Sequence, residues 1–133
     1  MSRLEIFCFG PLRINLAGRD IFAQFEADTA RALLLYLNLN PGIPLTREML
    51  AALLWPDQPV GTGLHNLRQA LFRVRRTLGD IEADNPFLEV TRNSIRIIPT
   101  KDIYLDVNEF GQIIQSVRSL EGPRQIRRDG QNL

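Results

Sequence analysis

A run of hydrogen-bond donors without any acidic residue occupies positions 62–78 of the 133-residue chain. The donors are Thr62, His65, Asn66, Arg68, Gln69, Arg73, Arg75 and Arg76. Guanidinium groups fork onto phosphate oxygens and guanine edges, and the amides of Asn and Gln pair with adenine edges. The chemistry that this run could perform is therefore recognition of a polyanion such as double-stranded DNA. The alternative is the solvated face of an amphipathic helix, although such faces usually mix charges of both signs.

Catalytic chemistry has few residues available. Cys8 and His65 are the only cysteine and histidine, so neither an internal disulfide nor a site with several Cys or His metal ligands can form. A Ser-His-Asp arrangement would need His65, which lies among arginines with no carboxylate nearby in sequence. We therefore expect no enzyme, and no metal, cofactor or small-molecule substrate.

Apolar side chains within the donor-rich run recur at the helical spacing of three and four residues. They are Leu64, Leu67, Leu71, Val74 and Leu78. Gly79 follows as a stop, because glycine adopts left-handed backbone angles at little cost. The spacing predicts a helix over residues 62–78 with one face in the core and the donors on the other.

The arginines are placed differently on this helix. Arg73 and Arg76 project from the polar face, so they are the best candidates for DNA contact. Arg68 and Arg75 lie closer to the apolar edge, where Arg75 could pair with an acid such as Glu48 instead.

The composition is that of a soluble globular domain, with 44% hydrophobic and 23% charged residues. The net charge is only +1, but residues 62–78 carry four Arg and no acid, whereas the segments on either side carry a small excess of acids. No apolar run approaches the ~18 residues of a membrane helix, and an acid interrupts the start of the chain where a signal peptide would be apolar. We expect a cytoplasmic protein with no membrane contact.

Short strands and a helix are predicted ahead of the donor-rich helix. Alternating side chains indicate strands at residues 4–9 and 12–16, and a third short strand is expected at residues 21–25. Residues 27–40 have an apolar stripe of helical period, and the Pro41-Gly42 pair stops this helix.

A second helix is predicted to begin after Thr46, which is a suitable N-cap, with Glu48 in the first turn where the helix dipole favours an acid. Its expected core residues are Met49, Leu50, Leu53 and Leu54. Trp55 closes it, and residues 56–59 form a turn that leads into the donor-rich helix. A short helix, a turn and an amphipathic Arg-rich helix make a helix-turn-helix arrangement.

A hairpin is predicted after the donor-rich helix. Residues 87–91 and 95–98 are its strands, and Arg92-Asn93-Ser94 is the turn, in which Asn tolerates left-handed angles. A hairpin at this place is typical of a wing, and Arg92 and Asn93 at its tip suit phosphate or a narrow minor groove. The alternative is a solvated hairpin tip.

The C-terminal part divides into three segments. Residues 99–104 are expected to form a connector that ends the main domain, residues 1–104. Asp106 is the expected N-cap of a C-terminal helix within residues 105–121. Residues 122–133 are polar and are expected to be a disordered tail.

Two segments in the middle of the chain resemble a known family. Residues 47–57 read Arg-Glu-Met-Leu-Ala-Ala-Leu-Leu-Trp-Pro-Asp, and residues 67–79 read Leu-Arg-Gln-Ala-Leu-Phe-Arg-Val-Arg-Arg-Thr-Leu-Gly. They are similar to the DNA-binding domain of SARP-type bacterial transcriptional activators, an OmpR-type winged helix. The resemblance implies an α+β fold, a winged helix-turn-helix with an N-terminal antiparallel β-sheet, a three-helix core and a C-terminal β-hairpin wing. The family's C-terminal bacterial transcriptional activator domain is expected to be absent.

The resemblance also implies functional roles. The helix at about 62–78 would lie in the major groove, and the wing at 91–95 would lie on the DNA backbone or the minor groove. Direct repeats of DNA would be the target, with a homodimer on DNA as one arrangement. The family's DNA-contacting helix positions correspond most clearly to His65, Gln69, Arg73 and Arg75. The loop that faces RNA polymerase in such proteins would here contain Trp55, Asp57 and Gln58.

The sequence departs from the family pattern at two places. Gly61 and Gly63 weaken the start of the donor-rich helix, and Ser94-Ile95 stands where the family usually has Gly-Tyr in the wing. We interpret the chain as the sequence-specific DNA-binding module of a bacterial transcriptional regulator, an activator by resemblance. The alternative is a winged-helix protein-interaction or dimerisation domain that does not bind DNA, which the near-neutral net charge favours.

Overall fold

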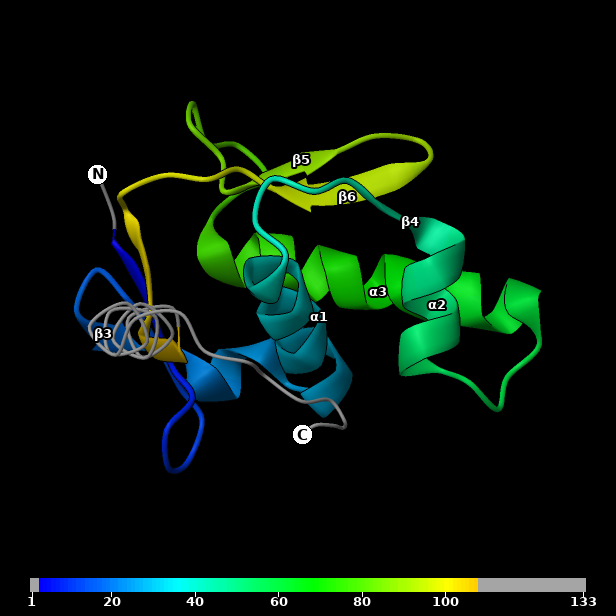
Figure 1. Cartoon of the computed structure of the whole chain (residues 1–133), viewed down its shortest axis with the longest axis horizontal. Coiled ribbons are helices and arrows are strands. Elements are labelled where there is room, and N and C mark those ends of the chain that lie inside the picture. The colour runs from blue at the N-terminus through cyan, green and yellow to red at the C-terminus, as the bar shows by residue number, and fades with distance from the viewer. Residues whose placement is uncertain (1–2, 108–133) are drawn as a thin grey trace, which may run out of the picture.

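The computed structural model describes residues 3–107 and has an α+β architecture. This part of the chain contains a mixed sheet, three α-helices and a second small sheet (Figure 1). The elements are β1 (Leu4–Phe7), β2 (Arg13–Leu16), β3 (Arg19–Asp20), the 3₁₀ helix η1 (Phe22–Phe25), α1 (Asp28–Leu39), β4 (Leu45–Thr46), α2 (Arg47–Leu54), α3 (Val60–Leu78), β5 (Leu88–Val90), β6 (Ser94–Ile97) and β7 (Ile103–Leu105).

The N-terminal sheet has the strand order β3-β2-β1-β7. β1 pairs with β2 in antiparallel register, Ile6 opposite Ile14, and with β7 in parallel register, Leu4 opposite Ile103. The N-terminal strands β1, β2 and β3 pair in antiparallel register, as expected, and β7 adds a parallel strand that makes the sheet mixed. The connector expected at residues 99–104 therefore ends in a strand that was not predicted. Three residues are too short a run to signal a strand, and the partner of β7 lies at the other end of the sequence.

The region after β2 differs from the prediction of a third strand at residues 21–25. Ala17 and Gly18 form a turn, both with positive φ, and lead into the short strand β3. The next residues form η1, whose first N–H, that of Phe22, donates to Asp20 Oδ1 at 2.9 Å. Ile21 and Phe25 are both buried. Residues four apart share a face both in a strand and in a helical turn, so this burial pattern could not distinguish η1 from the predicted strand.

The α1 helix forms as predicted. Its N-cap is Ala27 and its C-cap is Asn40. The buried side chains include the four expected ones, Ala30, Leu33, Leu34 and Leu37. Asn38 is also buried, and its amide donates to the Leu34 carbonyl at 2.8 Å, which satisfies the polar group inside the core.

The α2 helix begins as predicted but buries a narrower stripe than expected. Thr46 Oγ1 accepts a hydrogen bond from the Met49 N–H at 3.1 Å, which caps the helix. Leu50 is buried, but Met49 and Leu53 are 39% and 47% exposed, so their assignment to the core is wrong. Ala51 is buried in their place, because α2 approaches α3 closely on that side.

The second sheet has the order β4-β6-β5 and includes the predicted hairpin. Val90 lies opposite Ile95 and Leu88 lies opposite Ile97, and β4 adds a third strand through Leu45 opposite Ile95. In Figure 1 the hairpin is drawn above α3. The α2 helix packs against the first half of α3, and η1, which follows the strands of the N-terminal sheet, packs near the other end of α3.

Candidate nucleic-acid interface

The α3 helix presents its donors away from the core. Leu67, Leu71, Val74 and Leu78 are buried, as the spacing predicted, whereas Leu64 is only half-buried. The helix begins two residues earlier than expected, and Gly79 ends it with φ 73°, as predicted. The predicted site residues Thr62, His65, Arg68, Gln69 and Arg76 are exposed, and Asn66, Arg73 and Arg75 are half-buried.

His65 and Gln69 interact on the polar face. Their side-chain Nε2 atoms lie 3.3 Å apart, a distance that permits a hydrogen bond when His65 accepts. Arg73 lies one further turn along the helix, so these three residues form one row at intervals of four. An amide, an imidazole and a guanidinium in one row can read base edges and phosphates in a groove.

The first turn of α3 is open to anions. Pro59 is the N-cap and offers no side-chain cap, and the turn holds no acidic residue. The helix dipole places partial positive charge there, and the N–H groups of such a turn are oriented to receive a phosphate oxygen. Thr62 is exposed in the same turn.

Glu26, the C-cap of η1, lies against the second half of the polar face of α3. Glu26 Oε1 lies 3.7 Å from Arg73 Nε and 3.3 Å from Arg76 Nη2. Thr77 Oγ1 donates to the Gln24 carbonyl at 3.3 Å, so the end of η1 is fixed against α3. The expected acid-free face therefore holds for the helix itself, but the fold adds one carboxylate to it. No local pattern in the sequence could reveal this contact, because Glu26 precedes Arg76 by 50 positions.

A shallow depression of about 480 Å³ surrounds this contact. Its lining residues are Glu26, Arg68, Gln69, Phe72, Arg73 and Arg76. Phe72 is half exposed, and the Arg76 guanidinium lies 5.5 Å from the centre of its ring. The cation and the ring attract each other at this distance, which holds Arg76 over the helix surface.

Arg75 lies near a different acid from the one expected. No ion pair joins Arg75 to Glu48 among residues 3–107, and the charge of Arg75 acts on Asp80 instead. Asp80 is buried, and its two carboxylate oxygens accept hydrogen bonds from the Phe87 N–H at 2.8 Å and the Leu88 N–H at 2.9 Å. Burial raises the pKa of Asp80, and these two bonds and the charge of Arg75 offset that rise in part.

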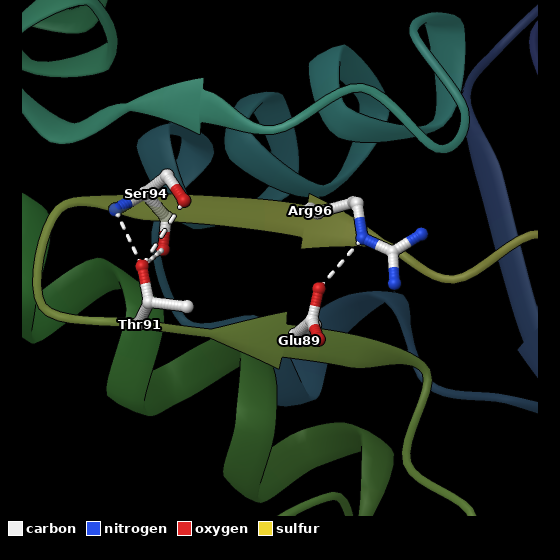
Figure 2. Close-up of polar contacts among 4 residues, drawn as sticks. All are labelled: Glu89, Thr91, Ser94 and Arg96. Carbon is white, nitrogen blue, oxygen red and sulfur yellow. Dashed lines mark hydrogen bonds and ion pairs between the residues drawn. The ribbon is translucent and has the colours of Figure 1, made fainter.

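The tip of the β5–β6 hairpin is a hydrogen-bonded turn with two exposed polar side chains. Thr91 Oγ1 accepts hydrogen bonds from the N–H groups of Asn93 and Ser94 at 3.3 and 3.0 Å. Figure 2 shows Thr91 and Ser94 facing each other, and an ion pair of 2.7 Å between Arg96 Nε and Glu89 Oε1 across the strands. Arg92 and Asn93, the two predicted contact residues, are exposed at the tip.

Arg47 connects the hairpin to α2, a role that the sequence analysis missed. Its Nε and Nη2 atoms donate to the Thr91 carbonyl at 3.3 and 2.9 Å, and its own N–H donates to the Asn93 carbonyl at 3.1 Å. The first residue of α2 therefore holds the turn that carries Arg92. Arg47 and Thr91 are 44 positions apart, so no local pattern could reveal the contact.

The loop between α2 and α3 combines a packed and an exposed part. Trp55 is half-buried and packs against the hydrophobic core. Asp57 and Gln58 are exposed, and the Gln58 N–H donates to the Trp55 carbonyl at 3.2 Å. These residues are accessible to a partner, although their expected contact with RNA polymerase stays a prediction.

Other chemistry has little support within residues 3–107. This segment contains no group of three or more His, Cys, Asp or Glu side chains placed to hold a metal ion. None of its helices has the length and apolar character needed to cross a bilayer. Burial and the neighbouring Asp106 raise the pKa of Cys8, which lowers its reactivity as a nucleophile.

Asp106 has a different contact from the one expected of an N-cap. Its carboxylate accepts hydrogen bonds from the Cys8 N–H at 2.9 Å and the Phe9 N–H at 3.1 Å, just beyond the end of β1. Asp106 and Val107 are helical, so Asp106 lies inside a helical turn rather than before it. The remainder of the helix expected within residues 105–121, and the expected tail at 122–133, lie outside the described residues.

The fold is similar to part of a solved structure. A solved structure of Mycobacterium tuberculosis EmbR in complex with a low-affinity phosphopeptide matches with a TM-score of 0.67 and 22% sequence identity. The match covers 83% of this chain and 28% of that one, so the chain corresponds to about a quarter of EmbR. No family model and no curated protein matched the sequence.

Proposed function

We propose that the chain is the DNA-binding module of a bacterial transcriptional regulator, folded as an OmpR-type winged helix-turn-helix. The observation that carries the proposal is the polar face of α3, where eight donor side chains are at least partly exposed on a helix that has no acid. The sequence resemblance to the SARP-type activators and the fold shared with part of EmbR support the same reading.

In this proposal α3 enters the major groove and the β5–β6 hairpin serves as the wing. The row of His65, Gln69 and Arg73 reads base edges, and Arg92 at the wing tip contacts the backbone or minor groove. Arg47 contributes indirectly, because it holds the wing tip through the Thr91 carbonyl. Activation, direct repeats as the target and contact of the α2–α3 loop with RNA polymerase are further parts of the proposal and rest on the family resemblance.

A titration with double-stranded DNA tests the proposal. Fluorescence anisotropy of a labelled random duplex at low salt should show binding, because phosphate contacts give sequence-independent affinity. Selection from a randomised duplex pool should then enrich a defined site. Absence of binding at every salt concentration would reject the proposal.

A second candidate is a domain that binds another protein rather than DNA. Met49, Leu53 and Val60 are large apolar side chains that are 39–68% exposed on α2 and at the start of α3, and Glu26 places an acid on the polar face of α3. Concentration-dependent association without any binding to duplex would favour this candidate.

A further inference from the structure

Glu26 occupies a backbone conformation that is unfavourable for its residue type. It follows η1 with φ 68° and ψ −11°, in the left-handed region where glycine is the ordinary choice. Its N–H donates to the Ala23 carbonyl, which closes the 3₁₀ turn. Any residue with an N–H could close this turn, so what Glu26 adds is its carboxylate.

That carboxylate is shared by two guanidinium groups of the proposed DNA-reading helix. One oxygen, Oε1, lies within 4 Å of both Arg73 Nε and Arg76 Nη2. These arginines are neighbours on adjacent turns and repel each other, and Glu26 offsets the repulsion. The three side chains are 38–58% exposed, so the ion pairs contribute little to folding in water.

The same carboxylate opposes a DNA phosphate. A phosphate that approaches Arg76 must either displace Glu26 from it or accept a like charge beside it. Both make binding to DNA weaker, and neither effect depends on the base sequence. Glu26 also lines the depression that holds Arg68 and Gln69, so its charge lies within the proposed interface.

We propose that Glu26 limits the affinity for DNA by competing with backbone phosphate for Arg76, the nearer of its two arginine partners. The proposal rests on the proposed DNA-binding function. It assigns Glu26 to non-specific rather than specific affinity. The carboxylate weakens binding to all duplexes, so that sequence reading by Arg73 and the other donors of α3 determines where the protein stays.

The test uses Glu26→Gln, with Glu5→Gln as the matched control. Both variants remove one negative charge from a glutamate paired with arginine, and Glu5 lies on β1, paired with Arg3 at 3.6 Å and away from α3. We expect Glu26→Gln to bind random duplex about 3–10-fold more tightly at low salt than Glu5→Gln, with a salt dependence steeper by about one unit. The advantage should therefore fade as salt increases.

A background without the two arginines shows whether the effect passes through them. In an Arg73→Gln/Arg76→Gln protein, the additional change Glu26→Gln should alter affinity no more than Glu5→Gln does. Glu26→Gly provides a second variant, because glycine suits the positive φ and also removes the acid. Circular dichroism and thermal unfolding confirm that each variant is folded.

The outcomes separate the two proposals. If the wild-type protein binds DNA and Glu26→Gln matches Glu5→Gln or binds more weakly, the competition proposal is wrong and DNA binding stands. If neither the wild type nor any variant binds duplex at low salt, DNA binding is wrong and the role of Glu26 is rejected with it. If Glu26→Gln and Glu26→Gly bind duplex and the wild type and Glu5→Gln do not, both the DNA-binding proposal and the competition proposal are supported.

Discussion

Asp80 joins the end of α3 to the start of the β5–β6 hairpin by accepting two backbone hydrogen bonds. Replacement by Asn keeps one acceptor but turns an NH₂ group toward a backbone N–H, which leaves a buried donor without a partner. We expect Asp80→Asn to lower the free energy of unfolding by about 1–3 kcal/mol. Urea denaturation of both proteins measures the difference.

The same pair of proteins should respond differently to pH. Burial raises the pKa of folded Asp80 above its ordinary value of 3.8, so the folded state holds this proton more tightly than the unfolded state. The contribution of Asp80 to stability is therefore greatest below its unfolded pKa and declines as pH rises through its folded pKa. The stability gap between wild type and Asp80→Asn should widen as pH falls toward about 4. A gap that stays constant or narrows on acidification would contradict the raised pKa.

Arg73 and Arg92 should have different roles in DNA binding. Arg73→Ala should weaken binding to a selected site by about 1–3 kcal/mol and to a scrambled site much less, because a major-groove contact carries sequence information. Arg92→Ala should weaken both about equally and reduce the salt slope by about 1, as expected for a phosphate contact. The opposite pattern would make the wing, rather than α3, the reader of sequence.

Single residues also show where sequence reasoning stops. The helical spacing identified the buried and exposed sides of α3, and the donor residues are accessible as expected. The contacts of Glu26 with Arg73 and Arg76, and of Arg47 with the β5–β6 hairpin, join residues 44 to 50 positions apart. Such contacts depend on how the elements pack, so a pattern within one window cannot reveal them.

At the scale of elements, the two glycines at the start of α3 have different functions. A methyl group at Gly61 would meet no atom within 4 Å, whereas at Gly63 it would lie 3.3 Å from the Ala51 side chain. The sequence analysis treated both as weaknesses of the helix, but Gly63 is buried and permits the close approach of α2 to α3.

Alanine substitutions separate these two roles. Gly61→Ala should stabilise the protein by about 0.5–1 kcal/mol, because alanine loses less backbone entropy in a helix. Gly63→Ala gains the same helix propensity, but the added methyl group would crowd Ala51 of α2. The Gly63→Ala protein should therefore be less stable than the Gly61→Ala protein by about 1–3 kcal/mol. Thermal unfolding of the two variants gives the comparison, and equal stabilities would show that α2 yields without cost.

The elements that sequence analysis missed are short and depend on distant partners. The α-helices and the hairpin have enough residues to show a period, and their bounds came within a few residues of those observed. β4 and β7 have two and three residues and become strands only by pairing with β6 and β1. The 3₁₀ helix η1 was taken for a strand, because a single helical turn is too short to display its period.

At the scale of the whole molecule, the uneven charge distribution predicts the salt response. If ~6 phosphates are neutralised by α3 and the wing, the logarithm of the affinity should fall with the logarithm of the salt concentration at a slope of about −5. Anisotropy titrations over a range of salt concentrations measure the slope. A flat response would exclude an interface dominated by phosphate contacts, despite the arginines on α3.

The pairing of β1 with β7 has a consequence for how the protein is made. The Cys8 N–H donates a hydrogen bond to the Asp106 carboxylate although 98 positions separate the two residues. The strand β7 therefore cannot join the N-terminal sheet until nearly the whole described segment has left the ribosome. At about 5–20 residues per second, β1 would wait for roughly 5–20 s with one edge unpaired. During synthesis this edge is open to pairing with other chains, so the stage most vulnerable to aggregation precedes the appearance of the last strand.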